Sequence, residues 1–328
     1  MLSDTELQSV QLVATSLTRP VTIFVAETAS DTQFETNLIN IARQISGVSL
    51  NRIKIEEADE SILPGKPSLT LSDETRRDIH YLAAPEGAEF GPFMDAVLWL
   101  GRGADPPGTE PFHSLRHLKD QTSILVLMAA LCPHCPQIVR NAVAASINCS
   151  LVSVTVVDAV EFSDLASRYK VKSTPTLIID DGLTLVGTIS LEDMVSHIIK
   201  ASEPAWLTAV LESMINAGRA EDAARLICRR KSPGAIMPLY RSQVFATRMG
   251  ALVAMEEALE AQHTIFDPVL DELTALLSLD DVSLRGDTAE LLGKIGNHSA
   301  IPALVRIADD PNPDVREAVM EALALLQK

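Results

Sequence analysis

Two cysteines separated by two residues stand between an apolar run and a helical pattern, and this arrangement constrains the fold more than any other part of the sequence. The run Ile124 to Leu131 predicts a buried strand, Cys132-Pro-His-Cys135 follows it directly, and helical spacing continues to about Ser146. Cys132 is therefore expected at a helix N-terminus, where backbone dipoles stabilise a thiolate, with Cys135 within disulfide reach. His134 can add positive charge beside the same thiolate, so the pair is a candidate redox centre.

Half of a zinc site is the competing interpretation of this spacing. His113 and His117 lie upstream and, with the two cysteines, would supply four ligands. Against zinc, the sequence holds no second Cys-x-x-Cys, and a predicted buried strand separates the histidines from the cysteines. The order of strand, Cys-x-x-Cys and helix is the one that redox chemistry needs. The sequence therefore favours redox chemistry and predicts no metal.

Strand and helix patterns alternate in the same order twice before residue 203. Residues 1–103 contain a predicted buried strand, Val21 to Val25, followed by helical spacing. Residues 108–203 contain the cysteine motif, further strands with a hairpin turn, and a closing helix. The turn-rich segment Gly101 to Gly108 separates the two. We expect two α/β domains, 1–103 and 108–203, the second built on a four-stranded mixed sheet.

Residues 204–328 show no convincing strand and repeat with a period of about 31 residues. The segment Leu284 to Leu292 aligns with Val315 to Leu323, and a degenerate earlier copy runs through Thr247 to Ala251. The copies resemble HEAT-type helix pairs, in which each pair buries its apolar face against its neighbours. The sequence thus predicts an all-α domain over 204–328 with about three helix pairs.

Composition narrows the classes of function. Lys and Arg number 27 against 44 for Asp and Glu, and the net charge of -17 would repel nucleic acid and anionic membranes. No uncharged apolar stretch approaches the length of a membrane span. The opening segment, Met1 to Val10, carries acids where a signal peptide needs a basic segment, and four cysteines are too few for a secreted disulfide scaffold. The sequence predicts a cytoplasmic protein.

A proline opens the second strand predicted after the cysteine helix, in Ser173-Thr-Pro-Thr176. A cis Thr174–Pro175 bond would expose the Thr174 backbone beside the cysteine pair, where an extended substrate could pair with it. The alternative is an ordinary trans proline at the start of a strand. The neighbouring cysteine motif and the order of elements favour the first interpretation.

Together, Cys132-Pro-His-Cys135 and Thr174-Pro175 in this order of elements resemble the thioredoxin superfamily. A closer likeness is to the tandem thioredoxin-fold unit at the N-terminus of the alkyl hydroperoxide reductase flavoprotein subunit and to the double-domain protein disulfide oxidoreductases. Three segments carry it: Lys66-Pro-Ser68, Tyr81 to Phe90 and Leu131 to Pro136. The resemblance covers about residues 1–203 and implies tandem thioredoxin-like folds, followed here by the HEAT-like helical repeats.

The resemblance also implies roles for single residues. The first domain would be catalytically silent, because Ala26 to Asp31 stands where a Cys-x-x-Cys would be. An acidic residue from that domain would face the cysteines as a proton acceptor, and Glu89 matches its motif position. A solvated carboxylate at a helix start is the alternative for Glu89. Val126 occupies the place of the aspartate that single-domain thioredoxins carry six residues before the first cysteine, which makes a borrowed carboxylate more plausible.

These observations predict a thiol-disulfide oxidoreductase. The Cys132 thiolate would attack a protein disulfide and Cys135 would resolve the mixed disulfide, with Pro133, Thr174 and Pro175 lining the substrate site. No glycine-rich dinucleotide loop is present, so the redox-active disulfide is the only cofactor expected. The resemblance implies a thioredoxin-reductase-like flavoprotein as electron donor and a peroxiredoxin as acceptor. The alternative is a redox-sensing adaptor whose helical repeats bind a protein partner.

Overall fold

The computed structural model describes residues 1–28, 32–58, 65, 67–73, 79–103, 110–201 and 203–327. The chain divides into two compact units, Met1–Ser202 and Glu203–Lys328, which are described separately below. Lys66, residues 29–31 and most of the turn-rich segment before Gly108 lie outside the described residues. No helix in the described ranges has the length and apolar character needed to cross a membrane.

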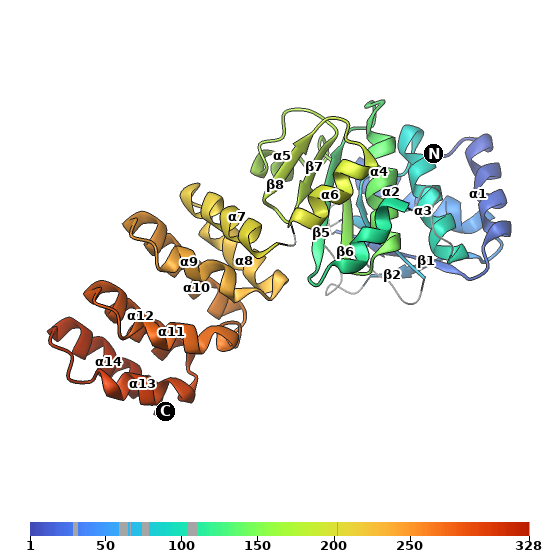
Figure 1. Ribbon diagram of the computed structural model, residues 1–328. Coiled ribbons are helices and arrows are strands. Elements are labelled where there is room, and N and C mark those ends of the chain that lie inside the picture. The colour runs from blue at the N-terminus through green and yellow to red at the C-terminus, as the bar shows by residue number, and fades with distance from the viewer. Residues whose placement is uncertain are drawn as a thin grey trace. The chain divides into compact units, whose positions relative to one another are not determined.

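Unit 1 is built around a single eight-stranded sheet with the order β2-β1-β3-β4-β6-β5-β7-β8 (Figure 1). The strands are β1 (Val21–Ala26), β2 (Ile53–Glu57), β3 (Ser68–Ser72), β4 (Ile79–Leu82), β5 (Thr122–Met128), β6 (Val152–Asp158), β7 (Thr176–Ile179) and β8 (Leu183–Val186). In each half the first two strands pair in parallel and the next two add antiparallel, so the halves repeat one topology. The expected tandem α/β folds are confirmed.

One feature of this sheet differs from the sequence prediction. The second half does not form a separate four-stranded sheet, because β4 and β6 pair in parallel, with Tyr81 opposite Val156, and join the two halves. All four residues of β4 are buried and β6 contains four valines, and each strand can bury its polar backbone groups only by pairing on both sides. The two halves therefore share one continuous sheet.

Helices cover the sheet of unit 1 and position the loops at its carboxyl edge. They are α1 (Asp4–Ser16), α2 (Gln33–Val48), η2 (Gly87–Glu89), α3 (Phe90–Arg102), η3 (Glu110–His117), α4 (Cys135–Asn148), α5 (Ser163–Arg168) and α6 (Leu191–Ala201). Helix α3 of the first half packs against α4 of the second, and α5 packs on the sheet face formed by Leu127, Val157 and Ile178. The contact between α3 and α4 brings the two halves together beside the cysteines.

Unit 2 is entirely helical, as predicted, and consists of successive helix pairs (Figure 1). Its elements are α7 (Pro204–Asn216), α8 (Ala220–Arg230), η4 (Pro233–Ile236), α9 (Met237–Tyr240), α10 (Phe245–Ala261), η5 (Asp267–Val269), α11 (Leu270–Leu276), α12 (Val282–Ile295), η6 (His298–Ala300), α13 (Ile301–Arg306) and α14 (Pro313–Leu325). The described residues form four pairs, one more than the sequence suggested, because α7 and α8 carry no clear copy of the repeat.

Arginines at matching positions of the repeats connect neighbouring pairs in unit 2. Arg248 on α10 bonds the carboxylate of Asp281, which caps α12, at 3.0 Å. Arg285 on α12 forms two bonds with Asp310, at 2.8 and 3.0 Å, and both side chains are buried. A two-pronged guanidinium–carboxylate pair fixes orientation as well as distance. These pairs set the spacing of successive helix pairs.

Candidate active site

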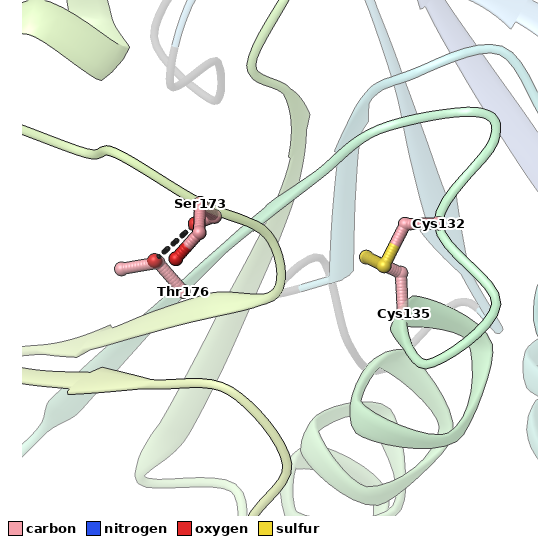
Figure 2. Close-up of a disulfide and its surroundings, with 4 residues drawn as sticks. All are labelled: Cys132, Cys135, Ser173 and Thr176. Atoms are coloured by element: carbon pink, nitrogen blue, oxygen red, sulfur yellow. Dashed lines mark hydrogen bonds between the residues drawn. A yellow bond between two sulfur atoms is a disulfide. The ribbon is translucent and has the colours of Figure 1, made fainter.

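Cys132 and Cys135 form a disulfide at the beginning of α4 (Figure 2). Their Cα atoms are 5.5 Å apart, the usual separation for a disulfide. Cys132 keeps 9% of its surface exposed whereas Cys135 is fully buried, so an approaching thiolate can reach only the first cysteine. The backbone N–H of Cys132 donates to the Ala129 carbonyl at 2.9 Å, which fixes the turn that presents it.

This turn corrects the predicted strand boundary. Strand β5 ends at Met128, and residues 129–131 turn toward the helix instead of extending the strand to Leu131. Leu131 is 97% exposed, although the apolar run suggested burial. The helix begins at Cys135, so Cys132 lies just ahead of its first residue. An apolar run alone does not show where a strand must bend to meet the next element.

The start of α4 is electrostatically suited to a thiolate. His134 occupies the N-cap position, makes no capping bond with its side chain, and is exposed together with Pro133. The first turn of α4 contains no acidic residue, so nothing on the helix itself opposes the positive end of its dipole. A thiolate at Cys132, just ahead of the first residue of α4, would be stabilised by the positive end of the helix dipole.

The proline loop lies at the same edge of the sheet as the cysteines. The Thr174–Pro175 peptide bond is cis. Strands β5 and β7 pair antiparallel with Leu127 opposite Thr176, which places residues 174 and 175 at the carboxyl end of β5, where the chain continues to Cys132. The Thr176 hydroxyl donates to the Ser173 carbonyl at 2.7 Å and closes this turn (Figure 2).

Glu89 reaches the same region from the first half of unit 1. It ends η2, which contacts α4, and only 3% of its surface is exposed. The alternative of a solvated carboxylate is therefore wrong. Neither carboxylate oxygen has a hydrogen-bond partner among the described residues. Burial raises the pKa of Glu89 to about 7 against the opposing positive charge of Arg140, and the charge of Asp158 adds to the rise.

Arg140 and Asp158 influence the pKa of this carboxyl group, and neither residue was expected at the site. Arg140 lies on α4, where its Nε bonds the Asp95 carboxylate on α3 at 2.6 Å. Asp158 is the last residue of β6. An acidic residue at the carboxyl end of a buried parallel strand is a recognisable signal for a site. Nothing in the sequence shows that Arg140 approaches Glu89, because that depends on the packing of α3 against α4.

The first half carries a different arrangement at the position that corresponds to the cysteines. Glu35 in the first turn of α2 is buried and accepts hydrogen bonds from the backbone N–H and hydroxyl of Thr28. Residues 29–31 of the motif noted in the sequence lie outside the described residues. Glu27 and Thr28, which are described, supply no thiol. The described part of the motif thus contains no redox group.

The zinc alternative finds no geometric support in the described ranges. His113 and His117 lie on η3. Nowhere in the described residues do three or more His, Cys, Asp or Glu side chains gather as a metal site would require. Cys149 and Cys228 are outside the disulfide, and their thiols contact the carbonyls of Leu115 and Ala258. Cys149 is buried and Cys228 is half-buried, and a packing role for both stays a prediction.

Two family models match parts of the chain. Residues 122–200 match a thioredoxin domain and residues 270–328 match HEAT repeats, which confirms the resemblances noted from the sequence. The F component of alkyl hydroperoxide reductase from Xanthomonas campestris pv. phaseoli is 24% identical over 195 residues, covering 57% of this chain and 36% of that protein. The match therefore spans about a third of that relative's length.

Two solved structures share the fold of unit 1. The alkylhydroperoxide reductase AhpF of Enterococcus faecalis superposes with a TM-score of 0.55 at 19% identity, covering 60% of this chain and 99% of that chain. A protein disulfide oxidoreductase from Aeropyrum pernix gives a TM-score of 0.54 at 18% identity, covering 62% and 94%. The thioredoxin-like fold and the Cys132–Cys135 disulfide together support thiol-disulfide oxidoreductase chemistry in general.

Proposed function

We propose that the chain is a protein-disulfide oxidoreductase whose two electrons are carried by Cys132 and Cys135. The observation that carries the proposal is the disulfide at the start of α4, of which only Cys132 is exposed. In the reduced form, the Cys132 thiolate attacks a substrate disulfide, forms a mixed disulfide and releases one substrate thiolate. Cys135 then attacks the Cys132 sulfur, which restores the internal disulfide and releases the second thiolate.

Glu89 is proposed to take the proton of Cys135 during the second step. A carboxyl group with a pKa of about 7 can exchange a proton near neutral pH, which suits a general base. Pro133, Thr174 and Pro175 are proposed to contact the substrate, with the Thr174 backbone pairing to an extended segment. His134 is proposed to stabilise the Cys132 thiolate.

The electron partners follow from the relatives and are proposals. The F component of alkyl hydroperoxide reductase matches unit 1 over about a third of its own length. We therefore propose that a separate thioredoxin-reductase-like flavoprotein reduces the disulfide, that a peroxiredoxin is one acceptor, and that unit 1 needs no cofactor besides its own disulfide. The helical repeats of unit 2 are proposed to bind a protein partner.

Alanine variants test the proposed function. Cys132→Ala should abolish reduction of a protein disulfide, because the attacking sulfur is lost. Cys135→Ala should accumulate mixed disulfides that are visible on non-reducing gels, because the resolving thiol is missing. Cys228→Ala, which removes a thiol from unit 2, is the matched control and should keep full activity. Full turnover by either active-site variant would refute the assignment.

A redox-sensing adaptor is the second candidate. Unit 2 matches HEAT repeats and exposes large apolar side chains, including Phe245 at 66% and Met320 at 61%. Repeat stacks of this kind commonly bind proteins along one surface. An adaptor would bind its partner with an affinity that changes between the dithiol and disulfide forms, and would show little multiple turnover in the assay above.

A further inference from the structure

A groove of about 560 Å³ opens in unit 1 at the carboxyl ends of β4, β5 and β6. Its lining residues come from both halves, with Phe34 and Glu86 from the first and Met128, Ala130, Asp158 and Glu161 from the second. Ala130 belongs to the turn that leads from β5 to Cys132. The groove therefore reaches to within two residues of the exposed cysteine, along the side that faces the first half of unit 1.

The polar part of the groove is negative. Its described lining contains three carboxylates and no Lys, Arg or His. Glu86 is held in place because its Oε1 accepts from the Asn37 amide at 2.9 Å, and Asp158 is held because its Oδ1 accepts from the Val160 backbone N–H at 2.9 Å. Glu161 is exposed at the rim. Two of the charges are thus fixed before any ligand arrives, which lowers the entropic cost of binding.

A second observation points to a positively charged occupant. Glu89 is not among the described lining residues of the groove, but it is 3% exposed and both its oxygens lack a hydrogen-bond partner in the described structure. Burial is the main cause of its raised pKa, and the negative charge of Asp158 adds to the rise. Neighbouring acids that are buried or fixed repel one another unless a cation or a proton intervenes. Arg140, whose positive charge lowers the pKa of Glu89, is already paired with Asp95. Above a pH of about 7, where Glu89 loses its proton, a cation bound at Asp158 would offset the repulsion between the two carboxylates.

We propose that the groove binds an extended, positively charged segment that flanks the disulfide of the protein substrate. The proposal rests on the proposed function and specifies its substrate class. The apolar side chains of Phe34 and Met128 can contact the aliphatic stems of lysine or arginine, while Glu86, Asp158 and Glu161 accept their charged ends. Binding on this side of Cys132 leaves the Thr174–Pro175 loop available to the segment that carries the disulfide.

The test uses three synthetic peptides that carry one disulfide flanked by lysines, serines or glutamates. The second-order rate of oxidation of the pre-reduced full chain is measured for each peptide and divided by its rate with dithiothreitol, which removes intrinsic reactivity. The lysine peptide should be fastest. Glu86→Gln with Glu161→Gln should slow it roughly 2- to 25-fold, as for two exposed ion pairs, and leave the serine peptide unchanged. Gln at Glu86 keeps the acceptor for Asn37.

The matched control neutralises two exposed carboxylates outside the groove, Glu110→Gln with Glu192→Gln. If both double variants slow the lysine peptide equally, net charge alone steers the substrate and the groove proposal is overturned. Equal normalised rates for the three peptides would overturn it as well.

The affinity of a cysteine-free lysine peptide, measured by fluorescence anisotropy, separates this proposal from the proposed function. If the pre-reduced wild type reduces no peptide disulfide faster than dithiothreitol does, the oxidoreductase proposal fails. The groove proposal still stands in that case if Glu86→Gln with Glu161→Gln alone weakens binding of the cysteine-free peptide. It fails if both double variants bind this peptide as the wild type does.

Discussion

Replacing Glu89 with glutamine should change how stability depends on pH. The folded protein holds the Glu89 proton up to a pH of about 7, whereas the unfolded chain releases it near 4.5. Between these values the folded state binds one proton more than the unfolded state, so the free energy of unfolding falls as pH rises. The difference in pKa corresponds to about 3 kcal/mol. Glutamine has the same shape and no proton to lose, so the variant should escape this decrease.

The assay is urea unfolding of the oxidised protein from pH 4.5 to pH 8, followed by tryptophan fluorescence. The sequence offers Trp99 in unit 1 and Trp206 in unit 2, so Trp206→Phe makes the signal specific for unit 1. The stability gained by Glu89→Gln should grow by about 3 kcal/mol across this range. Glu192→Gln controls for the loss of one charge from an exposed site. If the free energy of unfolding depends on pH in the same way for Glu89→Gln and the wild type, the reasoning is refuted.

Gly91→Ala should change the pKa of Glu89 by displacing Arg140. A Cβ added at Gly91 would lie 2.7 Å from a guanidinium nitrogen of Arg140, so Gly91→Ala must displace that side chain. Arg140 opposes the rise in the pKa of Glu89. Its displacement should therefore move the pH at which Glu89 loses its proton in the folded protein, read from the pH dependence of stability, above 7. A midpoint that stays in place or falls would show that Arg140 does not act on Glu89.

Two further predictions concern unit 2. Arg285→Ala leaves Asp310 buried without its partner and should lower the free energy of unfolding by about 3–5 kcal/mol, measured by urea unfolding with circular dichroism. The double variant Arg285→Ala with Asp310→Ala should recover part of this loss. If the effects of the two single substitutions simply add in the double variant, the pairing is contradicted. Gly293→Ala places a Cβ 2.8 Å from the Ala322 Cα and should destabilise by about 1–3 kcal/mol, whereas Gly286→Ala on the same helix has room and should stabilise by roughly 0.5–1 kcal/mol. Equal signs for the two glycine variants would contradict the helix contact.

Local patterns in the sequence were sufficient to predict most helices and strands of unit 1. Strand β7 spans Thr176–Ile179 and begins directly after Pro175, as the sequence predicted, because a proline and a hairpin turn mark its two ends. The end of β5 was predicted too late, because Leu131 continues the apolar run without being buried. Short-range signals of this kind identify an element more reliably than they place its ends.

The candidate site was only partly visible in the sequence. The cysteine motif and Thr174-Pro175 are local signals and could be read directly. The burial of Glu89 could not, because it results from the packing of η2 and α3 of one half against α4 of the other. The groove depends on the ends of three strands that meet only after β4 pairs with β6. Contacts between halves leave no periodic pattern in either half.

The parallel pairing of β4 with β6 has a consequence for any attempt to separate the two halves. Cutting the chain near residue 103 would leave Ile79–Leu82, all buried in the intact protein, as an edge strand of one fragment, paired with β3 on one side and open on the other. The other fragment would expose Val152–Asp158 in the same way. Apolar strands with unsatisfied backbone groups recruit further copies and aggregate. The half that contributes no cysteine therefore acts as a permanent cover for the half that does, and each keeps the other from self-association.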